Sequence, residues 1–184
     1  MGGQELAGLA ADVIHVAAVV AYLTALIFAA LYDLTTYRIP NGTSVAVVVS
    51  FAASAATSGL APTEILLHVG AGLTMLSLGV ALFALRLIGG GDAKLLASVA
   101  LWMGFHSLPV FLVVVALLGG VLAAAIVFAR RIPFPPSWHG VPWLARLIAP
   151  GQGLPYGVAI SAGAVIVVLR LGGADPLLHI GLAL

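Results

Sequence analysis

Long runs of apolar residues with almost no charge dominate this sequence and limit what the chain can fold into. A helix needs about 20 apolar residues to cross the hydrocarbon core of a bilayer. Several runs reach that length, and of the 184 residues 62% are hydrophobic and only 7% charged, against about 25% charged in soluble domains. A chain of this composition cannot form a water-facing surface. We therefore expect an all-α, polytopic membrane protein that is solvated by the lipid bilayer.

Five runs are long enough to be membrane spans, and a sixth, Leu95–Phe105, is short. The short run reaches the lower limit of about 17 residues only if its helix begins near Gly89. Lys and Arg tend to remain cytoplasmic. If the short run crosses the membrane, only Arg170 lies on the side opposite the other Lys and Arg residues. If the short run instead enters the membrane and returns, these residues divide four against three between the two sides. We predict six transmembrane helices in a single domain over residues 1–184, with both termini outside. The long runs are Val13–Tyr32, Ser44–Leu60, Ile65–Ile88, Val110–Phe128 and Leu154–Leu171.

Several classes of protein are excluded by what the sequence lacks. It has no cysteine, which rules out a disulfide-stapled fold and a thiolate zinc site. The five histidines show no metal-ligand spacing, so we expect neither a metal nor a cofactor. A net charge of +1 gives no field that would attract nucleic acid. The first residues carry no basic cluster, so the N-terminal run is predicted to be a permanent span instead of a cleaved signal peptide.

The longest stretch between predicted spans, residues 130–153, is rich in Pro, Trp and Arg. We predict a cytoplasmic interfacial loop, with Trp138 and Trp143 at the level of the lipid headgroups and the arginines near anionic lipid. Contact with a substrate is the alternative role for this loop.

Two of the six acidic residues, Asp33 and Asp92, stand out by their position. Each lies at the predicted cytoplasmic end of an apolar span, so the topology brings both to one membrane depth. The other four are placed where water or a helix N-terminus accommodates them, with His68 a possible partner of Glu64 one helical turn away. They are Glu5, Asp12, Glu64 and Asp175.

The sequence around each aspartate suggests a local structure. After Asp33 comes Ile39-Pro40-Asn41, in which proline stops a helix and Asn41 can cap the next one. Asp92 follows three glycines, Gly89, Gly90 and Gly91, which have no Cβ atom and let another backbone approach closely. This pattern would hold an extended peptide against a carboxylate.

Two carboxylates close together in a poorly solvated site cannot both ionise easily, so one keeps its proton. The ionised group can take a proton from water while the protonated one donates to a scissile carbonyl, which is aspartic peptide hydrolysis. A single aspartate at a membrane boundary is more often a solvated helix end, and a glycine run more often a tight turn. The occurrence of both aspartates and the glycine run on one side of the membrane, together with Ile-Pro-Asn, favours a catalytic site. Lys94 lies roughly 200° around a helix from Asp92, so we expect an interfacial anchor or a group that tunes the site.

These residues resemble those of type IV prepilin peptidases, which are intramembrane aspartic proteases of the G-x-G-D class, and in particular the small Tad-type form. Gly89 through Lys94 match G-x-G-D-x-K, and Asp33 followed by Ile39, Pro40 and Asn41 matches the first aspartate and I-P-N. Pro155, Tyr156 and Gly157 resemble the P-Y-G start of the family's last span.

The resemblance implies an aspartic endopeptidase of the cytoplasmic (inner) membrane, whose active site faces the cytoplasm. It would cleave the leader of type IV prepilins or pseudopilins after a glycine at the membrane boundary, with Asp33 and Asp92 catalytic and the other motif residues positioning the substrate. Its partners would be these precursors, and the resemblance implies no cofactor. Larger members also transfer a methyl group and carry a Cys-rich insertion, which this chain lacks. The resemblance does not give the oligomeric state.

Three other functions are compatible with the two aspartates and the predicted spans. A presenilin or signal-peptide-peptidase-like protease also pairs Tyr-Asp with G-x-G-D, but it lacks Ile-Pro-Asn after the first aspartate. A small proton-coupled carrier would use Asp33 and Asp92 as relay groups, although such groups usually lie near the bilayer midplane. A structural secretion subunit is the third option. A serine protease and a P-loop protein are disfavoured because G-x-S-G and Walker A motifs are absent.

Overall fold

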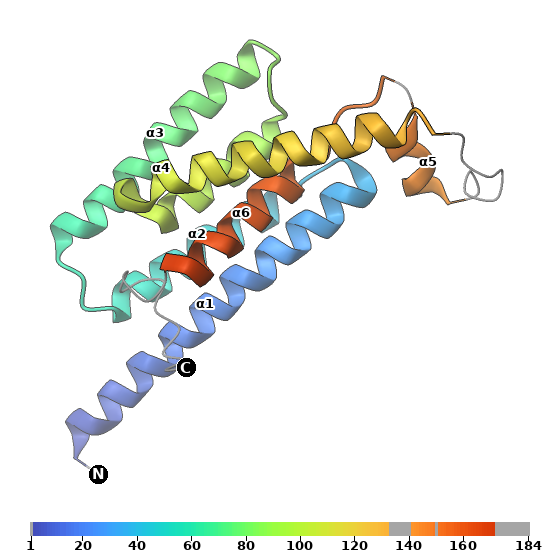
Figure 1. Ribbon diagram of the computed structural model, residues 1–184. Coiled ribbons are helices and arrows are strands. Elements are labelled where there is room, and N and C mark those ends of the chain that lie inside the picture. The colour runs from blue at the N-terminus through green and yellow to red at the C-terminus, as the bar shows by residue number, and fades with distance from the viewer. Residues whose placement is uncertain (1, 133–140, 150, 172–184) are drawn as a thin grey trace.

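The computed structural model describes residues 2–132, 141–149 and 151–171, and within these ranges the fold is entirely helical (Figure 1). This confirms the all-α prediction. Three helices, α1, α3 and α4, are long and apolar enough to cross a membrane, whereas α2 and α6 are shorter apolar helices. The elements are α1 (Gly3–Thr36), α2 (Asn41–Thr57), α3 (Pro62–Ala84), α4 (Gly90–Ala129), α5 (Pro142–Ile148) and α6 (Tyr156–Leu171).

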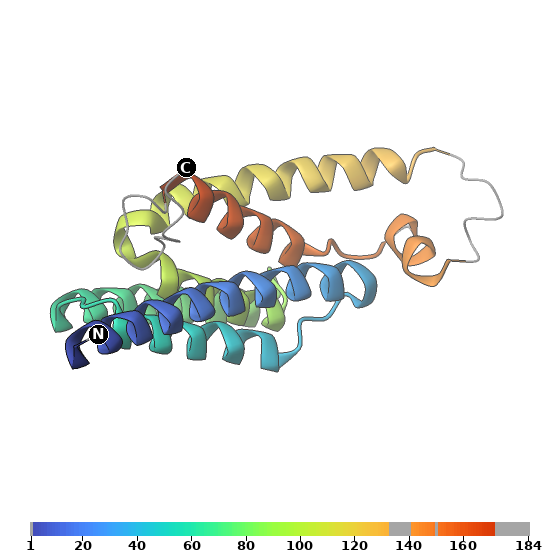
Figure 2. The ribbon, with the colours of Figure 1, turned by 90° about the horizontal axis from the view of Figure 1, so that it is seen from below.

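Helix α4 contains both the short apolar run and the run after it, because the chain turns back inside it at Gly104. This glycine has φ 58° and ψ 176°, outside the helical region. Figure 2 shows the two halves of α4 running in opposite directions. The predicted gap between Phe105 and Val110 is therefore wrong: the reversal comes earlier, and Pro109 lies inside the second half. The first half begins at Gly90, as a crossing requires, and six spans remain a prediction.

His68 on α3 supports this reversal. Its Nδ1 lies 2.9 Å from the carbonyl oxygen of Leu101, which accepts a hydrogen bond near the end of the first half of α4. The ring also packs on Gly104, where an added Cβ would lie 2.8 Å from the His68 Cε1. The predicted pairing of His68 with Glu64 is wrong, since Glu64 instead accepts a hydrogen bond from the Ala61 amide at the start of α3.

The core lies where the first half of α4 meets α1 and α2. Trp102 is fully buried, stacks on Tyr22 with ring centroids 4.4 Å apart, and donates its indole N–H to the Val47 carbonyl at 2.9 Å. Helices α2 and α3 each pack on α4 but scarcely on each other. Many large apolar side chains face outward, as expected for a protein surrounded by lipid.

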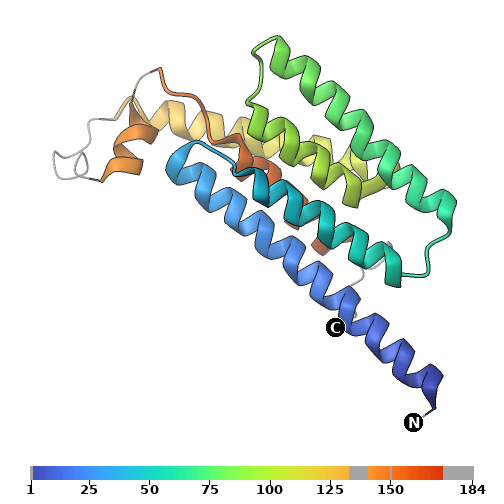
Figure 3. The ribbon, with the colours of Figure 1, turned by 180° about the vertical axis from the view of Figure 1, so that it is seen from behind.

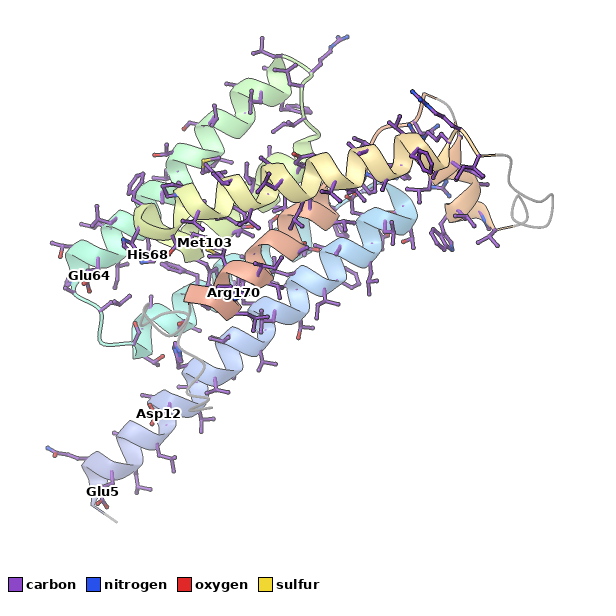
Figure 4. The ribbon with its side chains drawn as sticks, in the orientation of Figure 1. Glu5, Asp12, Glu64, His68, Met103 and Arg170 are labelled. Carbon is purple, nitrogen blue, oxygen red and sulfur yellow. The ribbon has the colours of Figure 1, made fainter. Side chains whose placement is uncertain are left out.

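The segments that join α1 to α2 and α3 to α4 lie at one end of the bundle together with the start of α6, and we call this end the loop end (Figure 3). Glu5, Asp12, Glu64 and Arg170 lie away from it (Figure 4). Part of the predicted interfacial loop is the short helix α5, on which Trp143 is exposed. Trp138 and Asp175 lie outside the described residues.

Replacing Gly104 by alanine tests the reversal. Its dihedral angles are close to glycine-only values, and the new Cβ would meet the His68 ring, so we expect a loss of about 2–4 kcal/mol of unfolding free energy in detergent. Gly59→Ala is the matched control, because Gly59 also has a positive φ (68°) but nothing lies within 4 Å of its added Cβ. Equal losses in the two variants would contradict packing of His68 on the turn.

Candidate active site

Four segments that carry the predicted site residues meet at the loop end of the bundle. They are the last turn of α1 with Asp33, the segment before α2 with Ile39, the start of α4 with Gly91 and Asp92, and the start of α6 with Gly157. Direct contacts connect these four segments in pairs.

Asp33 is buried, with 4% of its surface exposed, and its carboxylate is held by the start of α6. The Gly157 amide donates to Asp33 Oδ2 at 2.8 Å, and the Val158 amide interacts with the same carboxyl group. The N-terminus of a helix carries a partial positive charge and free N–H groups, both of which favour a carboxylate. A Cβ at Gly157 would lie 2.9 Å from Asp33 Oδ2, so the absence of a side chain permits this contact.

Asp92 lies in the first turn of α4 and is half-buried. The Gly89 amide is a hydrogen-bond partner of its carboxyl group. An added Cβ at Gly89 would lie 2.8 Å from Asp92 Oδ2, so this glycine also makes room for a carboxylate. Gly91, beside Asp92, and Gly157, which bonds Asp33, both pack on Ile39. The two aspartates, far apart in sequence, thus lie in adjoining segments.

Ile39 fills the space between the glycine run and α6. A Cβ at Gly91 would lie 3.1 Å from Ile39 Cβ and 3.5 Å from the Ile39 nitrogen, and a Cβ at Gly157 would lie 2.7 Å from Ile39 Cδ1. The glycine run does allow another backbone to approach, but that backbone belongs to the chain itself. Gly90 contacts a different neighbour, the ring of Phe83 on α3.

Asn41 and Lys94 join the two motifs by their side chains. Lys94 Nζ donates to Asn41 Oδ1 at 3.0 Å, across two helices. The prediction that Asn41 caps the second helix is wrong, because Pro40 is the N-cap of α2 and Asn41 is its first helical residue. Its amide oxygen is therefore available to Lys94.

Pro155 and Tyr156, just before Gly157, pack against the bundle. Pro155 is buried, and the Tyr156 ring packs on Gly119 of α4, where an added Cβ would overlap the phenol. Tyr156 thus fixes α6 on α4, next to the helix turn that places Gly157. No sequence pattern singles out Arg130, whose guanidinium bonds to Leu147 of α5 and to Gln152 in the segment before α6.

An apolar groove with a cavity of about 500 Å³ opens beside Lys94 and Asn41. It runs between α2 and α3, where these helices scarcely touch, and the first half of α4 forms its floor. Its polar groups gather at the end near the aspartates, and the remainder is lined by apolar side chains. The lining includes Asn41, Ser44, Val48, Leu73, Lys94 and Ser98.

Within the described ranges no three His, Cys, Asp or Glu residues come close enough to hold a metal ion. The chemistry the site offers is that of two interacting carboxyl groups, one buried and one half-buried, at the end of an apolar bundle. Such a pair can share a proton and act as acid and base.

A family model described as the type IV leader peptidase family matches residues 20–124 of the chain. The chain belongs to the type IV leader peptidase family. The match includes Asp33, Ile39–Asn41 and Gly89–Lys94, whereas the start of α6 lies outside it.

Curated relatives of this leader peptidase family member include the prepilin leader peptidase/N-methyltransferase of Aeromonas salmonicida, in strain A449 and in a second sequence from the species. Each is 33% identical over 66 residues, which cover 33% of this chain and 23% of the relative. The aligned region is thus less than a quarter of the relatives' length. No solved structure matches the chain.

Replacing Gly157 by alanine tests the contact between α6 and Asp33. The added methyl group would lie within 3 Å of both the carboxylate and Ile39, so we expect about 1–3 kcal/mol lower unfolding free energy. Gly120→Ala on α4 is the control, since nothing lies within 4 Å of its added Cβ and alanine favours the helix by up to about 1 kcal/mol. Thermal unfolding in detergent measures both. A Gly157→Ala protein as stable as wild type would contradict the close packing.

Proposed function

We propose that this member of the type IV leader peptidase family is an aspartic endopeptidase in which Asp33 and Asp92 form the catalytic pair. The observation that carries the proposal is the position of these two carboxyl groups at one end of the bundle, where Asp33 is bonded by the Gly157 backbone and Asp92 by the Gly89 backbone. The family match around both aspartates supports the same assignment.

The reaction follows from the chemistry of a shared proton. The ionised carboxylate takes a proton from water as the water oxygen attacks the scissile carbonyl carbon, while the protonated carboxyl group donates to the carbonyl oxygen. The C–N bond of the resulting diol then breaks. The leaving nitrogen takes up the proton that the first carboxylate had removed from water. The second carboxyl group regains the proton that it had donated, as the carboxylic acid of the product forms. The pair titrates jointly, so the roles are assigned to the pair and not to one residue.

The substrate we propose is a type IV prepilin or pseudopilin precursor, cut after a glycine where its leader meets the membrane. The Aeromonas relatives are named for prepilin leader peptidase activity, and the proposed site lies at the end of an apolar bundle. Arg38 and Arg86 lie in the segments that join α1 to α2 and α3 to α4 at that end, which favours an active site facing the cytoplasm from the inner membrane. The proposal is confined to peptide cleavage and does not extend to methyl transfer.

The groove between α2 and α3 supports a substrate with a long apolar helix. It is continuous with the proposed site through Lys94 and Asn41, and it opens sideways where α2 and α3 part. We assign its occupant as the apolar helix of the precursor, because a helix there would place its cytoplasmic end beside Asp92. Small residues on the floor, such as Ala97 and Ser98, allow a second helix to approach closely.

Removing either carboxyl group tests the catalytic pair. We expect Asp33→Asn and Asp92→Asn each to lower precursor cleavage by at least about 100-fold, because the amide can neither hold nor accept the proton. Asp12→Asn, an exposed aspartate on α1 away from the site, should cleave at the wild-type rate. The size shift of a co-expressed precursor, followed by rates in detergent, gives the measurement. Cleavage that persists without one carboxyl group would contradict the catalytic pair, whereas a wild-type protein that cleaves no precursor would favour a carrier.

Site-directed cross-linking tests the groove, and the sequence has no native cysteine that could form a competing disulfide. In the Asp92→Asn background, Val48→Cys and Leu73→Cys should form disulfides with a precursor that has one cysteine in its apolar helix. Leu117→Cys, on the exposed side of α4 away from the groove, is the control. If the control cross-links as strongly, or if neither groove position does, the groove holds lipid or nothing and the assignment is wrong, whatever the outcome for the aspartates.

A further inference from the structure

Arg130 binds the backbone of the segment that leads into α6. It lies at the C-terminal end of α4 and is half-buried. Its Nε donates to the Leu147 carbonyl at 3.1 Å, and one Nη donates to the carbonyls of Gln152 and Gly153 at 3.0 and 3.2 Å. The rigid guanidinium fork suits several acceptors at once.

The same guanidinium is close to the residue that ends α1. Tyr37 has φ 57°, and its amide donates to the Asp33 carbonyl at 2.8 Å. Burial raises the pKa of the Tyr37 phenol, and the Arg130 cation acts on it in the opposite direction. Helix α5, whose Leu147 carbonyl accepts from Arg130, also contacts α1, so Arg130 lies near both the helix that carries Asp33 and the segment that leads to Gly157.

We propose that Arg130 is a positioning residue that holds the start of α6 so that the Gly157 amide meets the Asp33 carboxylate. As far as activity is concerned, this rests on the proposed function. Between Ile148 and Tyr156 the described residues form no helix, so the bonds from Arg130 to Gln152 and Gly153 hold a segment that lacks regular hydrogen bonds of its own, and the bond to Leu147 joins Arg130 to α5. A displacement of about 1 Å at a catalytic group can cost about 100-fold in rate.

Arg131 provides a matched control. It is the next residue and has the same charge, but its side chain is exposed. A general role of positive charge at the membrane surface would involve both arginines. The clamp, by which we mean the bonds from the guanidinium to the carbonyls of Leu147, Gln152 and Gly153, involves Arg130 alone.

The first test compares steady-state cleavage by the full chain in detergent. We expect Arg130→Gln to lower kcat about 10- to 100-fold with KM within about threefold, because the variant misplaces a carboxylate and leaves the groove intact. Arg131→Gln should match wild type. Arg130→Lys should recover only part of kcat, since the flexible ammonium lacks the rigid planar fork whose separate N–H groups bond Leu147 and Gln152. Equal losses at Arg130 and Arg131, or full recovery by lysine, would overturn the clamp.

A double-mutant cycle separates positioning from general destabilisation. If Arg130 acts through the contact between Gly157 and Asp33, the double variant should lose less kcat than the product of the fold-losses of Arg130→Gln and Gly157→Ala. Losses that multiply fully would show that Arg130 acts elsewhere and would overturn the proposal.

Hydrogen–deuterium exchange gives a readout that needs no substrate. We expect Arg130→Gln to raise exchange over residues 151–158 at least about tenfold, and Arg131→Gln to leave it unchanged. Unchanged exchange in Arg130→Gln would overturn the clamp even if the wild type cleaves precursors. Raised exchange in a protein whose wild type cleaves no precursor would instead retain the clamp and refute the proposed function.

Discussion

A carboxylate buried among apolar helices must find hydrogen-bond donors inside the protein, and the arrangement of this bundle depends on how Asp33 finds them. Burying an unpaired charge is far more costly than burying an apolar group. Lipid offers no donors, so the donors must come from another part of the chain. The start of α6 supplies them, with the Gly157 amide at 2.8 Å from Asp33 Oδ2. A helix N-terminus is suited to this because its first amides have no partner within the helix.

That contact determines what can surround it. Gly157 must lack a side chain, and Ile39 then fills the remaining space between α6 and Gly91. Close approach at Gly91 brings the first turn of α4 beside Asp33, and with it Asp92. Lys94 and Asn41 join the starts of α4 and α2 by an exposed hydrogen bond. The three motifs are thus separate contributions to one packed junction.

The sequence was sufficient for features that depend on composition and order along the chain. The apolar runs predicted a helical membrane protein, and the alternation of spans predicted that Asp33 and Asp92 share one end. Features that depend on contacts between distant segments were missed or wrong. Asn41 was predicted as a cap because its type and position fit one, yet Pro40 has that role and Lys94 binds the amide. Nothing local to Arg130 shows that three carbonyls from a later segment surround it.

The hydrogen bond between Gly157 and Asp33 also constrains the path of the chain. Asp92 and Gly157 lie at the same end of the bundle, so the chain between them must traverse the bundle an even number of times. The reversal at Gly104 provides this, since one half of α4 leads away from the loop end and the other half returns to it (Figure 2). If the short apolar segment had dipped in and come back, the single long run after it would have carried Gly157 to the opposite end. The charge pattern favoured a membrane crossing on statistical grounds, and the bond to Asp33 independently agrees with two traverses of the bundle between Asp92 and Gly157.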